Sequence, residues 1–326
     1  MKKNAKFGNA EKIEGYIFST GSSFNQLSER VAGENSKHPG QKYIAGDLDI
    51  ATDENGLNIV TIHYSYVTPT YSTGTVNKTY AVLKQIIDNP KATWMESGKE
   101  GALKVRCTGV SIGVNDFIGA DGSKVAALRN ENGFCEIVTS LTENEAERSS
   151  FTADMLIIKV THINADPDKN IKQDYTTING CIFGFGPKII PATFTVRNTN
   201  GMAYFENLDV SPAAPVFTKV WGKINCRTEK IEKTEESAFG EAAVRTYERK
   251  TREYLITGTA KIPYDFGDEE VLTAEDIKKM SQDRQVLLAE VEKRFNERQI
   301  AKATGGGNGS FQAAAQQTIP DGSFVF

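Results

Sequence analysis

The sequence predicts a mainly β protein with one long helix near its C-terminal end. Three observations carry this prediction. Most of the first 260 residues form short apolar-polar segments separated by turn residues, which is typical of strands. Two longer alternating segments, 216–230 and 243–261, flank a charged stretch and predict a long hairpin. A helical spacing of apolar residues sustained over several turns begins only after residue 272.

The shorter strands follow one another along the first 208 residues. Residues 43–50 and 57–67 flank Asp53-Glu-Asn-Gly56, a cluster of turn formers, and predict a hairpin. Further strands are expected at 12–19, 103–112, 124–128, 134–139, 155–163, 176–185, 192–197 and 203–208. One helix interrupts them at 77–88, with Asn77 as its N-cap.

The long helix is expected to open at Leu272-Thr-Ala-Glu-Asp276, where Thr273 is the N-cap and Asp276 completes a capping box. Its apolar stripe is narrow and its opposite face is heavily charged, so we expect it to dock on the strands or on a partner helix. The stripe comprises Ile277, Met280, Leu287 or Leu288, Val291 and Phe295. After Lys302 a glycine-rich linker predicts a flexible tail over 304–326 that ends in Phe324-Val-Phe326.

Composition limits the class of protein. With 326 residues, 39% hydrophobic and 25% charged, the chain is long enough for two soluble globular domains. It has no run of about eighteen apolar residues, and its basic first residues are not followed by an apolar signal segment. We therefore expect a cytoplasmic protein. The cysteines (Cys107, Cys135, Cys181 and Cys226) are widely spaced, which predicts free buried thiols.

The stretch 216–227 carries the strongest functional signal. Side chains alternate between faces along a strand, so Val216, Val220 and Ile224 point to one side. The other side presents rings interleaved with cations: Phe217, Lys219, Trp221, Lys223 and Arg227. Rings that stack on bases and cations that meet phosphates suit an unpaired nucleic acid strand. The simpler alternative is an amphipathic strand whose two rings cover a neighbouring helix.

The returning strand repeats this pattern. Arg245, Tyr247 and Arg249 fall on one face of the segment that we expect to pair with 216–230. A second ring cluster lies at Tyr64, Tyr66, Tyr71 and Tyr80. The alternation with Val60 and Ile62 predicts that Tyr64 and Tyr66 are core, whereas Tyr71, in a polar loop, and the nearby Lys78 are candidates for contacting a ligand.

Motifs for enzymatic chemistry are not found in the sequence. It contains no GxxxxGK[ST] loop, HExxH or CxxC, and Gly180-Cys-Ile-Phe-Gly-Phe-Gly186 does not have the spacing of a dinucleotide fingerprint. Asp47 and Asp49 share one strand face, where two carboxylates are usually solvated. We therefore assign no catalytic residue, metal or cofactor. The net charge of −4 excludes a uniformly basic surface but permits a local basic groove.

Three segments carry a resemblance to a known class of proteins. They are Lys42 to His63, which reads KYIAGDLDIATDENGLNIVTIH, Thr218-Lys-Val-Trp-Gly-Lys-Ile224 and Glu253-Tyr-Leu-Ile-Thr-Gly258. Over residues 10–300 the chain resembles single-stranded DNA-binding proteins built on OB-folds, in particular the type of phages and prophages of Firmicutes. The resemblance implies OB-type barrels, a basic aromatic groove and a C-terminal tail that recruits replication proteins. Such tails are usually acidic, whereas Asp321 is the one charged residue here after Lys302.

An OB-fold is a five-stranded barrel that binds oligonucleotides on one face. The strand count predicts two barrels, at 1–150 and 151–265, followed by the helix at 266–303 and the tail at 304–326. We expect a non-catalytic protein that binds single-stranded DNA in phage or mobile-element replication or recombination. Its partners would be that DNA and, through Phe324 and Phe326, replication or recombination proteins; self-association is compatible with this. The alternatives are a structural virion protein and, with least support, a nuclease.

Overall fold

The computed structural model describes residues 7–119, 121–167, 171–185, 188–235, 239, 243–264 and 272–304. Within these, the side chains of 228–235, 243, 245–250 and 302–304 are not described. The protein is mainly β, as predicted. Its strands are β1 (Asn9–Ser19), β2 (Ser28–Val31), β3 (Lys42–Ala51), β4 (Ile59–Val67), β5 (Lys104–Ile118), β6 (Lys124–Glu131), β7 (Phe134–Ile137), β8 (Ser149–Ile163), β9 (Tyr175–Gly184), β10 (Lys188–Val196), β11 (Val216–Glu235) and β12 (Ala243–Thr259).

The first five-stranded ring is closed by β1, β3, β4, β6 and β5. Each strand pairs with the next in that order, and β5 returns to β1. All pairings are antiparallel except that between β4 and β6, which is parallel. Helix α1 (Lys78–Asp88) lies in the connection between β4 and β5. Five strands in a closed Greek-key order make this ring OB-like.

A second ring repeats the same order later in the chain. It runs through β8, β9, β10, β12 and β11 and returns from β11 to β8. The pairing of β10 with β12 is parallel, and the short helix α3 (Thr199–Glu206) occupies the position that α1 has in the first ring. The fold prediction of two OB-like barrels followed by a helix is therefore confirmed.

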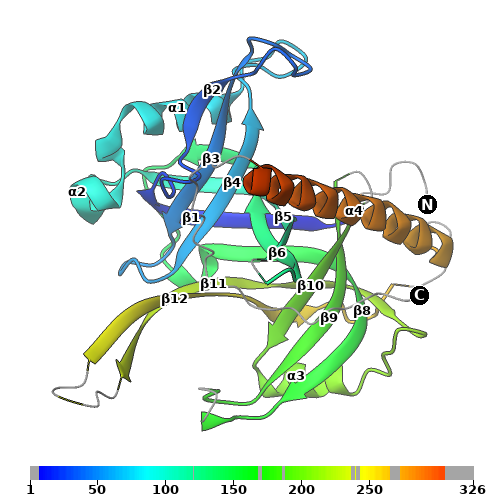
Figure 1. The fold of residues 1–326 in the computed structure, drawn as a ribbon. Helices are drawn as coiled ribbons and strands as arrows, with labels where there is room; N and C mark the ends of the chain where they lie inside the picture. Colours follow the sequence, from blue (N-terminus) through cyan, green and yellow to red (C-terminus); the bar gives the residue numbers. More distant parts are fainter. Residues whose placement is uncertain are drawn as a thin grey trace.

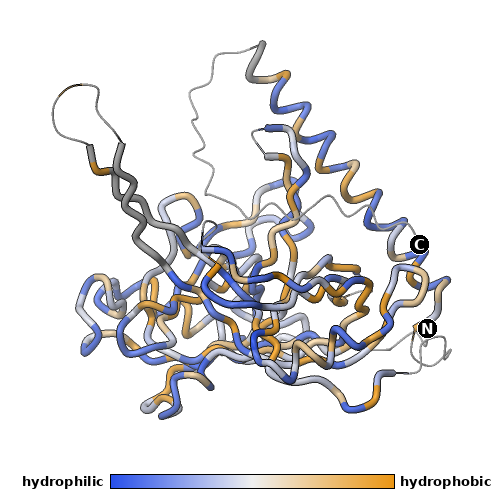
Figure 2. Tube along the Cα trace, turned by 90° about the horizontal axis from the view of Figure 1, so that it is seen from below, coloured by the Kyte–Doolittle hydropathy of each residue, from blue (hydrophilic) through white to orange (hydrophobic). Residues whose placement is uncertain are grey.

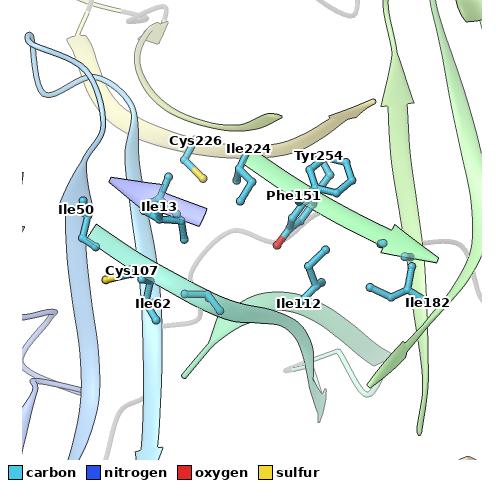
Figure 3. Close-up of a cluster of buried hydrophobic side chains, with 14 of the residues drawn as sticks. Ile13, Ile50, Ile62, Cys107, Ile112, Phe151, Ile182, Ile224, Cys226 and Tyr254 are labelled. Atoms are coloured by element: carbon cyan, nitrogen blue, oxygen red, sulfur yellow. The ribbon is translucent and has the colours of Figure 1, made fainter. Parts of the chain in front are cut away.

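The two rings form one continuous sheet, because β1 pairs with β8 over residues 9–13 and 149–153 (Figure 1). One hydrophobic core also runs through both rings. Figure 3 shows Ile13, Ile50 and Ile62 of the first ring in the same cluster as Phe151, Ile224 and Tyr254 of the second. The ring strands fall at 9–131 and 149–259; the division into domains at residue 150 stays a prediction.

Helix α4 (Ala274–Thr304) begins with the predicted capping box. The Asp276 amide donates to the Thr273 hydroxyl at 3.1 Å, and the Thr273 amide donates to the Asp276 carboxylate at 3.2 Å. Figure 2 shows hydrophilic and hydrophobic residues alternating along α4. Its first turns bury Ile277 and Met280, and Arg284 forms a bidentate ion pair with Asp116 of β5 at 2.6 and 3.2 Å. The helix therefore docks on its own strands.

Two predictions about local structure are wrong. Residues 203–208 were expected to form a strand, but 199–206 form α3, because the Asn198 side chain caps a helix by accepting from the Gly201 amide at 2.6 Å. Tyr66 was expected in the core with Tyr64. Tyr64 is fully buried, but the pairing of β3 with β4 shifts between Ile44 and Gly46, so Tyr66 turns outward and is 44% exposed.

The remaining short helices are η1 (Pro90–Ala92), α2 (Trp94–Gly101) and η2 (Glu145–Glu147). Helix η2 lies in the connection between the two rings. Helix α1 begins where the sequence predicts, with the Asn77 side chain accepting from the Thr79 and Tyr80 amides. Of the predicted tail, residues 305–326 lie outside the described residues. Among the described helices, none combines the length and apolar character needed to cross a lipid bilayer.

Candidate nucleic-acid interface

The predicted alternation along β11 is present. Thr218, Val220 and Ile224 are fully buried on the inner face. The outer face carries, in order, Lys219, Trp221, Lys223 and Arg227; the two lysines are half-buried, and Trp221 and Arg227 are exposed. We call these four residues the β11 outer row. The prediction that the indole lies on the solvent side of the hairpin, beside cations, is therefore confirmed.

Phe217 does not belong to this row. Its side chain is 1% exposed and packs against the rings of Phe7, Phe183 and Tyr264. The beginning of α4, at Leu272, Ile277 and Met280, joins the same cluster. Phe217 points outward as predicted, but Tyr264, Leu272 and the first turns of α4 cover that end of the strand. Its predicted stacking on a base is therefore wrong.

Trp221 lies beside a shallow depression with a volume of about 330 Å³. The indole is 40% exposed. The depression is lined by parts of β8, β11, β12 and η2, namely Ala146, Glu147, Ser150, Phe151, Thr152, Trp221, Gly222, Lys223 and Thr257. A ring that is held at the edge of an open hollow can stack on a planar ligand on its free side.

The cations of the β11 outer row are not neutralised by carboxylates of the described side chains. Among the described side chains, no carboxylate lies within ion-pair distance of Lys219, Lys223 or Arg227. By contrast, Arg197, which lies above the Tyr175 ring on the neighbouring β-strands, is neutralised by Glu253 at 2.8 Å. An unpaired cation next to an exposed ring can neutralise a phosphate without first breaking an internal ion pair.

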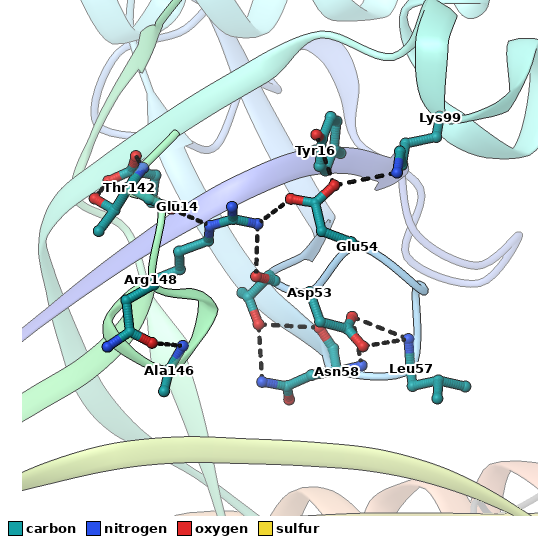
Figure 4. Close-up of polar contacts among 12 residues, drawn as sticks. Glu14, Tyr16, Asp53, Glu54, Leu57, Asn58, Lys99, Thr142, Ala146 and Arg148 are labelled. Carbon is teal, nitrogen blue, oxygen red and sulfur yellow. Dashed lines mark hydrogen bonds and ion pairs between the residues drawn. The ribbon is translucent and has the colours of Figure 1, made fainter. Parts of the chain in front are cut away.

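Helix η2 is held in place by polar contacts to the first ring (Figure 4). Arg148, which is 4% exposed, donates to the Thr142 carbonyl and to the Glu54 carboxylate, both at 2.6 Å. The Arg148 guanidinium, helped by Lys99 and Tyr16, lowers the pKa of Glu54 to about 2. Glu14, fully buried on β1, accepts from the Thr142 amide at 2.6 Å and from the Arg106 guanidinium at 3.1 Å. These contacts fix the wall that η2 contributes to the depression.

The other predicted residues are not brought to this face or cannot be placed. Tyr71 is 41% exposed in the loop before α1, and Lys78 is the exposed first residue of α1. Figure 1 places α1 on the far side of the first ring from β11, so these two residues do not join the β11 outer row. The side chains of Arg245, Tyr247 and Arg249 lie outside the described residues, as do Phe324 and Phe326.

Several residues near the surface sites were missed by the sequence reasoning. Glu147, Ser150, Thr152 and Thr257 line the depression, but they come from three separate segments and no local pattern links them. Tyr43 and Tyr66 pair on the first ring with their centroids 4.4 Å apart. The regular alternation of residues around Tyr66 predicted a buried side chain. The bulge that turns Tyr66 outward, towards Tyr43, has no sequence signal.

The outer face of β3 and β4 is acidic and internally satisfied. Asp47 contacts the His63 ring nitrogen at 2.8 Å, and Asp49 accepts from the hydroxyls of Ser19 and Thr61 at 2.6 Å each. In the described part of the chain, His, Cys, Asp and Glu side chains do not gather in groups of three or more that would suit a metal ion. The four cysteines are buried and unpaired, as predicted.

The position of Trp221 depends on Gly258, its direct partner on β12. A Cβ atom at residue 258 would lie 2.4 Å from the indole nitrogen, so Gly258→Ala must displace the ring. We expect the emission maximum of Trp221 to shift, measured in a Trp94→Phe background that leaves it as the one tryptophan. Gly33→Ala is the control, since its new Cβ meets no atom within 4 Å. An unchanged spectrum in Gly258→Ala would contradict this packing.

Comparison with known proteins gives a family and a distant structural likeness. The structure is similar to a deletion mutant of the single-stranded DNA-binding protein from Thermus aquaticus, with 10% sequence identity and a TM-score of 0.43. That likeness covers 82% of this chain and 100% of the other. No curated protein matches. The family model named YorF matches residues 23–294, which is well over half of the sequence, and the chain therefore belongs to the YorF family.

Proposed function

We propose that this protein binds single-stranded DNA without catalysis and acts in phage or mobile-element DNA replication or recombination. The observation that carries the proposal is the β11 outer row, in which an exposed indole is flanked by Lys219, Lys223 and Arg227, all without ion-pair partners among the described side chains. The row lies on an OB-like ring, an architecture whose outer surface commonly binds oligonucleotides. Trp221 would stack on a base while the cations neutralise the flanking phosphates.

The proposed contact should depend little on the base sequence of the DNA, for chemical reasons. Stacking uses the π-face that every base has, and phosphate contacts carry no sequence information. Binding through this row should therefore tolerate most sequences and weaken as salt rises. Phe324 and Phe326, at the end of the chain, are the residues that we propose for recruiting replication or recombination proteins.

The direct test is a titration of the full chain with a fluorescent dT oligomer at about 50 mM and about 200 mM salt. Three phosphate contacts on a single strand give a slope of roughly −2 in log K against log salt, so affinity should fall roughly 15- to 20-fold between these conditions. The triple variant Lys219→Gln, Lys223→Gln, Arg227→Gln should bind more weakly and lose most of this slope.

The matched control removes three exposed cations elsewhere, with Lys37→Gln, Lys91→Gln and Lys293→Gln, and so gives the same change in net charge. It should retain most of the affinity. If both triple variants lose affinity equally, the effect is one of net charge and the β11 outer row is not the site. If the natural chain shows no saturable, salt-sensitive binding and instead assembles into rings, tubes or shells, it is a structural protein.

A further inference from the structure

The depression beside Trp221 is lined by several polar residues whose side chains have no hydrogen-bond or ion-pair partner among the described residues. The hydroxyls of Ser150, Thr152 and Thr257 form no side-chain hydrogen bond within the described part of the chain, and Lys223 has no ion pair there. A volume of about 330 Å³ is at the lower end for small-molecule sites. A ring at the edge and several uncommitted polar groups below it are the features of a site for one planar, polar ligand.

Glu147 adds a specific chemistry to this site. An ionised carboxylate only accepts hydrogen bonds, and it has two oxygens with which to do so. The Asn144 side chain donates to Glu147 Oε1 at 2.9 Å, and Oε2 has no partner among the described residues. Glu147 is exposed, so its carboxylate keeps most of its acceptor capacity for a ligand.

The carboxylate is also held in position before any ligand arrives. The Asn144 side-chain oxygen accepts from the Ala146 amide at 3.1 Å and so fixes the start of η2. On the other side of Glu147, Arg148 is anchored to Thr142 and Glu54 at 2.6 Å. Figure 4 shows these contacts tying η2 to the first ring, although the depression opens beside β11 of the second. A preorganised acceptor loses little freedom on binding.

We propose that this depression is a subsite for one unstacked guanine base of the bound strand; the inference rests on the proposed function. The Watson–Crick edge of guanine presents two adjacent donors, N1–H and the exocyclic N2 amino group, which match the two oxygens of a carboxylate. Thymine presents one N–H between two carbonyl oxygens, which a carboxylate repels. Trp221 supports the base from its side, and Lys223 meets the adjoining phosphate.

The test compares three oligomers that differ at one central position, which is dT, deoxyguanosine or deoxyinosine, each titrated against the full chain. Inosine keeps N1–H but has no N2 amino group, so it isolates the second hydrogen bond. We expect the guanosine oligomer to bind roughly five- to tenfold more tightly than the all-dT oligomer. The inosine oligomer should fall between them.

Glu147→Gln should abolish the guanosine preference and leave the binding of the all-dT oligomer unchanged or slightly stronger. Glu145→Gln is the matched control, because it makes the same charge change in the same short helix but does not line the depression. Equal affinities for the three oligomers would overturn the subsite and leave single-stranded DNA binding standing. No saturable binding of any oligomer would overturn both.

Discussion

Replacing Glu11 with Gln should stabilise the protein by on the order of 3–4 kcal/mol at pH 8 and by less than about 1 kcal/mol at pH 5. Glu11 lies on β1 between the rings, is 2% exposed, and neither carboxylate oxygen has a hydrogen-bond partner among the described residues. The nearby Tyr254 hydroxyl donates to Asn130 at 2.7 Å instead. Burial raises the pKa of the Glu11 carboxyl to about 8, against the opposing charge of Arg252.

The sign follows from proton linkage. A carboxyl whose pKa is raised by folding binds its proton more tightly in the folded state. Its stabilising contribution is complete below the unfolded pKa of 4.5 and is lost as pH rises through about 8. Glutamine cannot ionise and removes this loss. Guanidinium chloride unfolding of both proteins at pH 5 and pH 8 measures the difference.

Glu14 on the same strand provides a matched substitution with the opposite expectation. Burial raises the pKa of Glu14, but hydrogen bonds from Arg106 and Thr142 outweigh this and bring it to about 2. Glu14→Gln should therefore destabilise the protein by on the order of 2–3 kcal/mol at pH 7, and the loss should shrink as pH falls from 4.5 towards 2. If both substitutions destabilise equally at pH 8, the protonated state assigned to Glu11 is wrong.

Replacing Trp221 with Ala should weaken the binding of a dT oligomer by about 1–3 kcal/mol, which is roughly 5- to 150-fold. In the proposed binding mode the loss comes from the base that would stack on the exposed indole, so the dependence of binding on salt should stay the same. By contrast, the variant that replaces Lys219, Lys223 and Arg227 with Gln should lose most of the dependence of binding on salt. Gel-shift or anisotropy titrations at two salt concentrations separate these effects.

Tyr66→Ala is the control for Trp221→Ala, since Tyr66 is exposed to a similar extent, 44% against 40%, but belongs to the first ring. It also packs against Tyr43, so these two side chains form an alternative aromatic surface on which a base could stack. Trp221→Ala should cost much more affinity than Tyr66→Ala. A larger effect at Tyr66 would indicate that the DNA binds at β3 and β4 instead.

Sequence patterns were sufficient where structure is set by neighbouring residues. The alternation along β11 and the capping box at Thr273 depend on residues a few positions apart, and both are present in the structure. The number of strands also predicted two OB-like rings. The parallel pairings that close them, β4 with β6 and β10 with β12, join segments more than fifty residues apart and have no local signal.

The errors have the same physical origin. Phe217 has the correct direction on β11, but its exposure depends on where α4 docks, and α4 begins 57 residues later in the sequence. Glu147 lines the depression because Arg148 anchors η2 to the first ring through Glu54. Both facts are consequences of tertiary packing. The sequence could therefore predict which residues carry the chemistry of the β11 outer row, but not the far wall of the site.

The central claim is that an unpaired strand stacks on Trp221. The chain has two tryptophans, so a Trp94→Phe variant leaves Trp221 as the one indole. When that variant is titrated with a dT oligomer to saturation, Trp221 emission should be quenched in proportion to the fraction of protein bound. Anisotropy measures that fraction independently. Saturable binding of the oligomer with unchanged Trp221 emission would contradict the claim.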